Sequence, residues 1–470
     1  MLLRLVLFLC LLAADASAKP NIVLVLADDF SMNLMPRNRG NLSTSMPNLA
    51  EMMRDGMVFN NYFVSSSICC PSRASLFTGM MPHNSGVLTN KEPDGGIFSY
   101  MRNHNDTKSF APALQAAGYK TAFMGKYLNG YRAKRSPTPM GWDEWASTDN
   151  GYIGFGFTLN HNGAFSTPPD HFTDTISQLG LDWINATPGP FFLELSTFSP
   201  HGPFTPPTRY NGAFLDVVMP KTLAYGARPD AAAPEWLQVI PPLRRFAKTN
   251  FESGFIRRVQ SSNGVDEMIG NLRLKLENLG IADNTYVIFT SDNGYHMGEY
   301  SLRAGKETPF DVDINVPFVV VGPGIAPGSR SHALVMNIDL AATFADLAGA
   351  VVPATSDGRS MVPLFTGGNG KRTMAVVEHL RVPPDPNDPD ATGAATGDPP
   401  TYIALRMKGA MYVEYLDGSG VVGYYDLIAD PFQLHNIAPT LTAARLAELH
   451  AAASANAQCV AAQCRAAQNR

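Results

Sequence analysis

The stretch NIVLVLADD, which runs from Asn21 to Asp29, is the strongest indication of the fold in this chain. After its first residue it is apolar as far as the two aspartates at its end. A short, continuous apolar run is typical of a strand that is buried on both faces, as strands in parallel sheets are. In open α/β sheets, ligands bind at the carboxyl ends of the strands. The run therefore predicts a buried strand that carries Asp28 and Asp29 to a binding site.

Helical and strand-like patterns alternate along most of the chain. SFAPALQAAG precedes the apolar stretch YKTAFMG, HFTDTISQLGLDWINA precedes FFLELSTF, and VDEMIGNLRLKLENLG precedes TYVIFTSD. Repeated pairs of a helix and a strand indicate an α/β domain with a mainly parallel sheet that is flanked by helices. We therefore predict one large domain of this class over residues 19–381.

The character of the chain changes after Arg381. Residues 382–400 are rich in Pro, Asp and Gly, which is typical of a surface loop. Beyond them, TYIALRMKGAMYVEYL and GVVGYYDL predict a small antiparallel sheet, and an alanine-rich helix follows from about Thr442. We expect residues 401–470 to form a smaller α+β subdomain.

Residues 1–18 have the pattern of a signal peptide. An early cation, Arg4, is followed by a short apolar run and by Ala-Ser-Ala just before Lys19. We therefore expect a secreted or lumenal protein, whether extracellular, periplasmic or lysosomal. No later stretch has the apolar length of a transmembrane helix, so the sequence predicts no membrane span. Three N-x-S/T sequons predict a glycoprotein if the host glycosylates and are otherwise chance matches; they begin at Asn41, Asn105 and Asn185.

Composition limits the remaining classes. The chain has 470 residues, of which 45% are hydrophobic and 16% charged, and this is enough for one large core and a smaller one. A formal net charge of −5 argues against a nucleic-acid-binding protein. The cysteines that remain after the signal peptide are too few for a disulfide scaffold. Cys459 and Cys464 can pair near a frayed helix end, but their spacing gives poor disulfide geometry inside an intact helix.

A second strand-like stretch also ends in oxygen ligands. TYVIFTSDNG carries Asp292 and Asn293 at its carboxyl end. Together with Asp28 and Asp29, these side chains supply three carboxylates and one amide oxygen, which suit a hard divalent cation such as Ca²⁺ or Mg²⁺. The alternative is that each pair is a turn or a helix cap. Because both pairs follow predicted buried strands, we favour the metal site.

The motif CCPSRASLFTG begins at Cys69. Pro71 suits the first turn of a helix, and the final glycine suits its end. Cys69 therefore lies at or just before a helix N-terminus, with Arg73 one turn away. Such a position binds anions and lowers the pKa of a thiol. The alternatives are a structural disulfide from Cys69 or Cys70 and a catalytic thiolate, which an oxidising compartment disfavours.

The same motif resembles the C-x-P-S-R-x-x-x-x-T-G signature of the type I sulfatases. The forms GKYLNGY, PHGPF and SDNGYHMGEYSL look closest to the branch of N-acetylglucosamine-6-sulfatases, extracellular heparan sulfatases and arylsulfatases. The resemblance implies an alkaline-phosphatase-like fold and a catalytic sulfatase domain over residues 19–381. It also implies that a formylglycine-generating enzyme converts Cys69 into formylglycine, a hydrated aldehyde. Ca²⁺, or alternatively Mg²⁺, is then expected to bind residue 69 together with Asp28, Asp29, Asp292 and Asn293.

Further segments carry the resemblance along the chain. GYKTAFMGKYLNGY, FSPHGPF and SDNGYHMGEYSLRAGKETPF are similar to the family segments that bear active-site cations and a histidine, here Lys126, His201 and Lys306. One position departs from the family, because Leu128 stands where many arylsulfatases have a histidine. We expect His296 to replace it as the base that releases sulfate. The alternative is that His296 supports the metal ligands from behind or contacts the substrate.

The resemblance implies a hydrolase of sulfate monoesters that acts on sulfated sugars or aryl sulfates. In this hypothesis Arg73, Lys126 and Lys306 offset charge on the sulfuryl oxygens, and His201 binds sulfate or protonates the leaving group. A phosphate or phosphonate monoester hydrolase of the same superfamily is the first alternative. The second is a non-catalytic sulfoglycan-binding protein in which Cys69 is never converted.

Overall fold

The computed structural model describes most of the chain. The predicted signal peptide and most of the predicted loop at 382–400 lie outside the described residues. The described residues are 19–36, 42–149, 152–383 and 396–469.

The predicted strand at the start of the chain lies at the centre of a large sheet. β1 (Asn21–Ala27) pairs in parallel with β8 (Phe191–Ser196) on one side and with β9 (Thr285–Ser291) on the other. The sheet has ten strands in the order β11-β2-β10-β9-β1-β8-β4-β5-β6-β7. The inner strands are parallel, and antiparallel pairs occur towards both edges. The remaining strands are β2 (Met57–Phe59), β4 (Lys120–Gly125), β5 (Glu144–Thr148), β6 (Leu159–His161), β7 (Ala164–Ser166), β10 (Phe318–Val321) and β11 (Ser329–Ser331).

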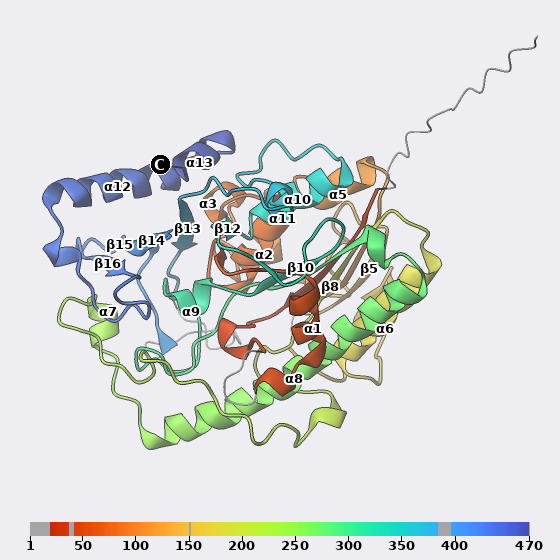
Figure 1. The fold of residues 1–470 in the computed structure, drawn as a ribbon, viewed down its shortest axis with the longest axis horizontal. Helices are drawn as coiled ribbons and strands as arrows, with labels where there is room; N and C mark the ends of the chain where they lie inside the picture. The colour runs from red at the N-terminus through yellow and green to blue at the C-terminus, as the bar shows by residue number, and fades with distance from the viewer. Residues whose placement is uncertain (1–18, 37–41, 150–151, 384–395, 470) are drawn as a thin grey trace, which may run out of the picture.

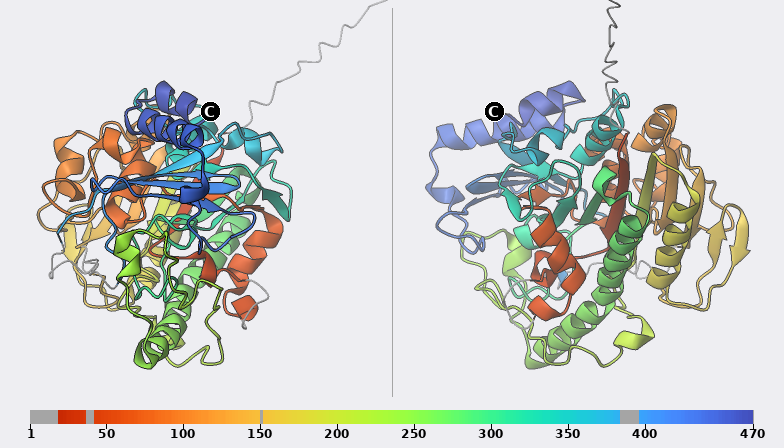
Figure 2. Two further views of the ribbon diagram at one scale, coloured as in Figure 1. Left: turned by 90° about the vertical axis from the view of Figure 1, so that its left-hand side faces the viewer. Right: turned by 45° about the vertical axis from the view of Figure 1, so that its right-hand side comes forward.

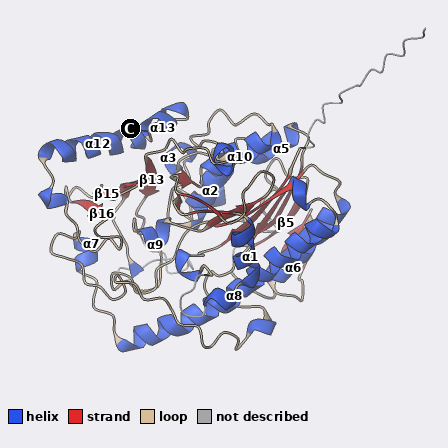
Figure 3. Ribbon diagram, viewed as in Figure 1, coloured by secondary structure: helices blue, strands red, loops and turns tan. Residues whose placement is uncertain are grey.

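Helices cover both faces of this sheet, and Figures 1 and 3 show the two layers. Successive side chains of β1 enter two different cores. Leu24 packs into one core and Val25 into the other, as expected for a strand that is buried on both faces. The fold class predicted from the sequence is therefore confirmed. One layer contains α1 (Pro47–Asp55), α6 (Phe172–Ala186) and α8 (Arg245–Asn278), and the other contains α2 (Cys69–Thr78), α5 (Phe110–Ala116) and α10 (Asp339–Ala348).

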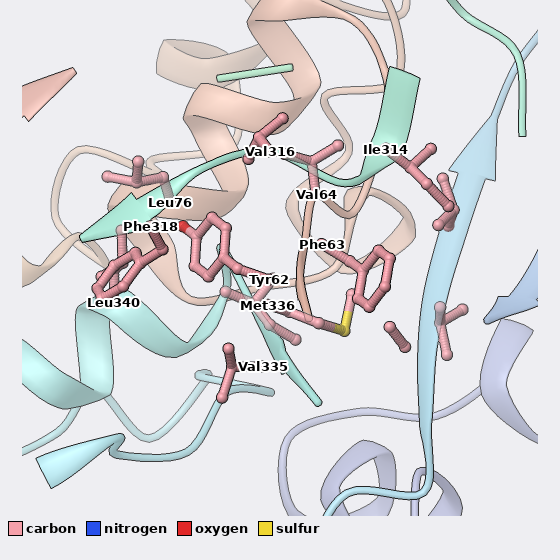
Figure 4. Packing of buried hydrophobic residues seen from close by; sticks show 14 of the residues in the cluster. Tyr62, Phe63, Val64, Leu76, Ile314, Val316, Phe318, Val335, Met336 and Leu340 are labelled. Carbon is pink, nitrogen blue, oxygen red and sulfur yellow. The ribbon is translucent and has the colours of Figure 1, made fainter. Parts of the chain in front are cut away.

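A tightly packed core fixes the position of α2. Tyr62 and Phe63 form β3, which pairs with β12 (Val335–Met336) beneath the helix. Figure 4 shows the apolar side chains that meet there, including Leu76 of α2. Tyr62 also packs against Phe318 with 4.7 Å between the ring centroids. Because close-packed cores relax little, this packing holds α2 in one place.

A four-stranded antiparallel sheet forms the smaller unit, in blue in Figure 2. Its strands follow one another in the order β13-β14-β15-β16. β13 precedes the predicted loop at 382–400 yet pairs with β14, so the smaller sheet begins before the predicted boundary at Arg381. Its elements are β13 (Met374–His379), β14 (Tyr402–Met407), β15 (Ala410–Tyr415), β16 (Val422–Asp426) and α12 (Ala443–Ala457). The shorter helices of the chain are α3 (Pro82–Ser85), α4 (Gly96–Arg102), α7 (Glu235–Gln238), α9 (Asp311–Ile314), α11 (Val362–Phe365) and α13 (Ala462–Ala467).

Cys459 and Cys464 form a disulfide. The last helix of the chain is not continuous, because α12 ends at Ala457 and α13 begins at Ala462. The break brings the two Cα atoms to 4.8 Å, within the ordinary range for a disulfide. Of the two possibilities left open by the sequence, the structure shows the interrupted helix.

The three sequons differ in their surroundings. Asn105 is fully buried, and its side-chain amide donates to the carbonyl oxygen of Ser85. A glycan on Asn105 is therefore incompatible with this fold. Asn185 is exposed and accepts a hydrogen bond from Lys275, whereas Asn41 lies outside the described residues. Within the described ranges, none of the helices combines the length and apolarity that a bilayer span requires.

Candidate active site

Two parallel strands bring the predicted metal ligands to one edge of the sheet. β1 and β9 run side by side in register, with Ala27 opposite Ser291, so the residues that follow each strand meet. The backbone N–H of Asp29 donates to Oδ1 of Asp292 at 3.1 Å. The amide of Asn293 donates to Oδ1 of Asp29 at 2.6 Å. Together with Asp28, these side chains form one fully buried group of oxygen donors.

Cys69 lies beside this group as the first residue of α2. The helix ends at Gly79, which has a left-handed conformation, as the motif predicts. The thiol of Cys69 is 3.5 Å from Oδ1 of Asp28 and 3.0 Å from Nζ of Lys306. Ligand atoms of Asp28, Asp29, Cys69 and His201 all lie within 4.8 Å of one another. The structure thus places residue 69 at the centre of the predicted site.

The neighbouring Cys70 has a different environment. It is fully buried, and its backbone N–H donates to the side chain of Asn90. Burial raises the pKa of its thiol to about 12, so Cys70 is protonated and unreactive at neutral pH. Within the described residues, only the disulfide pairs cysteines, and both Cys69 and Cys70 are thiols. Of the two adjacent cysteines, only Cys69 contacts the acidic cluster.

Three buried cations surround the carboxylates. Nε of Arg73 is 2.8 Å from Oδ2 of Asp292. Nζ of Lys126 is 2.5 Å from Oδ2 of Asp28. The third cation, Lys306, lies 2.8 Å from Oδ1 of Asp29. All three predicted cations therefore converge on the predicted metal ligands from α2, from the segment after β4 and from the loop after β9.

The charges of the cluster are balanced unevenly. Burial raises the pKa of Asp28 to about 6, and the charge of Asp292 acts in the same direction. Burial alone would also raise the pKa of Asp292, but the charge of Arg73 is the main cause that holds it below its usual range. Of these two carboxylates, Asp292 is therefore the more firmly ionised, and Asp28 is the one whose charge a further cation would stabilise more.

The donor set fits a hard divalent cation. Oδ2 of Asp29 and Oδ1 of Asn293 are fully buried and have no hydrogen-bond partner among the described residues. A buried oxygen without a partner costs about 1–3 kcal/mol, so a bound cation would stabilise these two atoms. Oxygen-only donors suit Ca²⁺ or Mg²⁺ rather than Zn²⁺. These two atoms, with Asp28 and Asp292 beside them, would hold the ion.

His201 lies at the rim of the cluster. Its Nδ1 is 2.6 Å from the carbonyl oxygen of Gly202, so Nδ1 carries a hydrogen. Its Nε2 is therefore the nitrogen that gains or loses a proton, and it is 3.6 Å from Oδ2 of Asp29. The ring stacks on Tyr152 at 3.7 Å, and the same tyrosine ring lies 4.6 Å from Nζ of Lys126. Tyr152 thus orients two site residues, and no motif in the sequence pointed to it.

His296 is placed differently from the other predicted site residues. It is fully buried, with Nδ1 2.9 Å from a carboxylate oxygen of Asp313 and Nε2 2.8 Å from the carbonyl oxygen of Thr396. Burial opposes the charged ring, yet the carboxylate of Asp313 raises its pKa above the usual value. Its backbone exchanges two hydrogen bonds with Gly305, the residue before Lys306. These contacts connect His296 to the loop that carries Lys306.

Arg258 is a site residue that sequence reasoning missed. It lies on α8 and is fully buried, and its Nη2 donates to the carbonyl oxygen of Asp29 at 2.6 Å. Its Nε and Nη1 have no hydrogen-bond partner among the described residues, while its guanidinium lies 4.4 Å over the ring of Tyr295. One signal could have found it, because Arg258 falls on the apolar stripe that includes Phe251, Phe255 and Val265.

Comparison with known proteins identifies the class. The sulfatase family profile matches residues 20–350, and the chain therefore belongs to the sulfatase family and is a sulfuric ester hydrolase. Among its relatives is the N-acetylglucosamine-6-sulfatase of Homo sapiens, 32% identical over 91% of this chain and 82% of that protein. The arylsulfatase of Volvox carteri is 31% identical over 74% of this chain and 60% of that protein.

Solved structures share the fold. The structure of BT4656 in complex with its substrate D-glucosamine-2-N,6-O-disulfate matches with a TM-score of 0.77 at 21% identity, over 95% of this chain and 98% of that chain. The phosphonate monoester hydrolase of Agrobacterium radiobacter matches with a TM-score of 0.69 at 21% identity, over 93% of this chain and 96% of that chain. At these identities the likeness concerns the fold alone. The sulfatase identity rests on the family match and the relatives in sequence.

Proposed function

We propose that this sulfatase removes sulfate from sulfated amino sugars by using a formylglycine made from Cys69 and one bound divalent cation. The observation that carries the proposal is the position of Cys69, buried at the start of α2 between Asp28 and Lys306. The names of the relatives support the choice of an amino-sugar 6-sulfate as substrate. The substrate of BT4656, a disulfated glucosamine, agrees with it.

The cofactors supply chemistry that the unmodified chain lacks. A hydrated aldehyde at position 69 offers one hydroxyl to attack sulfur and a second to release sulfate, and a divalent cation lowers the pKa of the attacking hydroxyl. The buried oxygens of Asp29 and Asn293 without partners are the donors that would hold the cation. Ca²⁺ is the expected ion, with Mg²⁺ as the alternative.

The chain's own residues supply orientation and charge. The cations Arg73, Lys126 and Lys306 are fixed by carboxylates before any substrate arrives, so they offset charge on the sulfuryl oxygens without having to reorganise. His201 presents Nε2 at the rim, where a protonated ring donates to the oxygen of the leaving alcohol. Nearly complete burial of the cluster excludes bulk water and strengthens each of these interactions.

His296 stays a predicted base rather than an observed one. Its two ring nitrogens face Asp313 and Thr396, which favours a role in positioning the Lys306 loop. Leu128, at the position of the histidine in many arylsulfatases, is fully buried in the apolar core.

We also propose that the protein is exported after cleavage of residues 1–18. The disulfide between Cys459 and Cys464 supports an oxidising compartment. Relatives named extracellular sulfatase homologues agree with this destination. Conversion of Cys69 by a formylglycine-generating enzyme must then precede folding, because the side chain is fully buried in the folded protein.

The test compares matched substrates and inspects residue 69. Purified protein should release sulfate from N-acetylglucosamine-6-sulfate, and more slowly from 4-nitrophenyl sulfate. The second candidate, a phosphate or phosphonate ester hydrolase, is favoured only by the shared fold. Faster turnover of 4-nitrophenyl phosphate or phenylphosphonate than of the matched sulfate would favour that candidate. A protein that binds these sulfates and hydrolyses none would be the non-catalytic alternative.

A further inference from the structure

A cavity of about 540 Å³ lies between the start of α8 and the loop after β9. Arg244, which caps α8, and Asn250, within the helix, line one side of it. Ser301 and Arg303 line it from the loop. The amino end of α8 lies at the active-site edge of the sheet, because α8 runs back along the sheet before β9 begins (Figure 1). The predicted site residues do not line this cavity, so it is separate from the catalytic cluster.

The cavity is cationic although the chain as a whole is acidic. Both arginines that line it, Arg244 and Arg303, are exposed, and neither has a side-chain hydrogen bond or ion pair with a described residue. Arg245 and Lys248, at the start of α8, are two further exposed cations on the same helix, although they do not line the cavity. The described residues that line the cavity include no Asp or Glu. Among the described residues, no acidic side chain in the lining therefore offsets this positive charge. On a protein with a formal net charge of −5, such a lining favours anionic ligands.

Much of the rest of the lining is apolar. Phe246 is 77% exposed, and Pro241 and Pro242 lie beside it. Large apolar side chains that are exposed together often mark a binding surface. An aromatic ring and two prolines with an adjacent amide, Asn250, suit a ligand that has both C–H faces and hydroxyl groups. A sugar ring that carries sulfate or carboxylate groups has this combination.

The backbone connects the cavity to the catalytic cluster. Arg303 precedes Lys306 by three residues, a span of at most about 11 Å for an extended chain. Thr396, which lines the cavity, accepts the hydrogen bond from His296. The far side of the cavity is more distant. Arg245, at the start of α8, lies about 20 Å along the helix from Arg258, which contacts Asp29 in the cluster, at about 1.5 Å per residue. The cavity therefore begins near the cluster and extends beyond the reach of a single monosaccharide.

We propose that this cavity is a second saccharide subsite, which binds an anionic sugar unit of the same sulfated glycan chain whose sulfate ester is hydrolysed. Arg244 and Arg303 pair with the sulfate or carboxylate groups of that unit, and Phe246 packs against its ring. The proposal rests on the proposed function, because it assumes that the reacting group is a sulfate ester on a glycan. It makes the enzyme one that prefers oligosaccharides to monosaccharides.

The test is a comparison of substrate lengths in a charge-reversal variant. The variant is Arg244→Glu/Arg303→Glu, and its control is Lys371→Glu/Lys408→Glu, which changes two exposed lysines outside the cavity by the same total charge. We expect kcat/KM for a heparin-derived hexasaccharide to fall about tenfold or more in the variant, which corresponds to the loss of about 1.4 kcal/mol of binding. For N-acetylglucosamine-6-sulfate we expect a change of less than about twofold. The lysine control variant should keep the wild-type kcat/KM for both substrates.

A binding measurement separates this proposal from the proposed function. Fluorescently labelled hexasaccharide is titrated into Cys69→Ala protein with and without the two arginine substitutions, which needs no turnover. Weaker binding only in the arginine variant supports the subsite even if no sulfate ester is hydrolysed. Equal losses on the hexasaccharide and the monosaccharide, equal losses in the control, or unchanged hexasaccharide binding would each overturn the subsite. Unchanged hexasaccharide binding together with normal turnover would overturn the subsite but not the proposed function.

Discussion

The guanidinium of Arg258 holds the carbonyl oxygen of Asp29 at 2.6 Å, and Asp29 is a non-glycine residue with a φ of 61°. A left-handed conformation is uncommon for such a residue and needs support from its surroundings. Here the support comes from a helix more than two hundred residues away in the chain. We infer that Arg258 fixes the direction in which the carboxylate of Asp29 faces the metal site.

Replacement of Arg258 by Met should weaken metal binding more than it weakens the fold. Loss of the hydrogen bond lets Asp29 leave its left-handed conformation, and we expect a drop in metal affinity on the order of tenfold or more, in the range found for residues that orient metal ligands. The melting temperature should change little, because a buried cation without a carboxylate partner adds little net stability. Calorimetric titration with Ca²⁺ and thermal unfolding check the two expectations.

Arg257→Met is the matched control for this variant. Arg257 is the adjacent residue on the same helix, is exposed, and lies over the ring of Phe204. Equal losses of metal affinity in both variants would show that the effect is general to α8 and not specific to the bond with Asp29.

Cys69 should be present as formylglycine in active protein, and Cys70 should not. Tandem mass spectrometry of the peptide that contains both residues should find an aldehyde at position 69 and an intact thiol at position 70. Cys69→Ser should abolish turnover or accumulate a sulfated protein, since a serine hydroxyl lacks the second hydroxyl of the hydrate. Cys70→Ser should keep at least about a tenth of the activity, because its thiol does not contact the cluster. Full activity in protein with only cysteine at position 69 contradicts the proposed mechanism.

Asp292→Asn should remove the bound cation. The substitution keeps the shape of the side chain but removes the negative charge that faces Arg73. The positive charge of Arg73 then opposes binding of a cation by the remaining ligands. Elemental analysis should find about one equivalent of Ca²⁺ in the wild type and far less in the variant. Asp143→Asn, which changes a surface ion pair with Lys120, should keep full metal content. Zinc in place of calcium in the wild type would refute the hard-cation assignment.

His201 and His296 should affect different steps. His201→Ala should slow the first step, in which the alcohol leaves, most for poor leaving groups, by a factor on the order of 10²–10⁴. If His296 is the base predicted from the sequence, His296→Ala should give a burst of alcohol followed by slow turnover. Its contacts with Asp313 and Thr396 favour the other result, a loss of turnover without a burst because Lys306 is displaced.

Pre-steady-state kinetics with 4-nitrophenyl sulfate distinguish the two roles of His296. His296→Gln serves as the conservative variant, because an amide can still donate to Asp313 or to Thr396. Partial rescue by Gln without a burst fits positioning of the loop. A clear burst in both variants fits the base instead.

Glu194 should make stability depend on pH. It is fully buried on β8, neither carboxylate oxygen has a hydrogen-bond partner among the described residues, and burial raises its pKa to about 8. Its folded pKa therefore exceeds the ordinary value, so the stabilisation is fully present below about pH 4.5 and is lost as pH rises through about 8. Relative to Glu194→Gln, the wild type should lose stability across that window, by up to about 1.4 kcal/mol per pH unit. Chemical unfolding at several pH values measures the free energy of unfolding of both proteins. If the two free energies changed with pH in parallel, Glu194 would not be the cause of the pH dependence.

Much of the site followed from local patterns. The apolar run that ends at Asp28, the run that ends at Asp292 and the motif at Cys69 each predict an element whose end carries chemistry. Because parallel strands share a carboxyl edge, two such ends are expected to meet, and they do. Arg258 and Tyr152 could not be placed in the same way, since neither lies in a motif and both reach the site through long-range packing. The break between α12 and α13 was also open, because helix propensity alone does not show where an alanine-rich stretch ends.

Hydrophobic periodicity and a long motif are local properties of the chain, so the fold class, the family and the charged residues of the site could be predicted without a structure. Which of these residues share a site, and how they are ionised, depends on the tertiary structure. Lys126 and Lys306 are ordinary lysines in sequence, and they become site residues only because burial beside Asp28 and Asp29 removes water and makes each ion pair strong. Tertiary structure also turned Arg258 towards a backbone carbonyl and His296 towards Asp313, because a side chain's partner depends on what the fold packs against it.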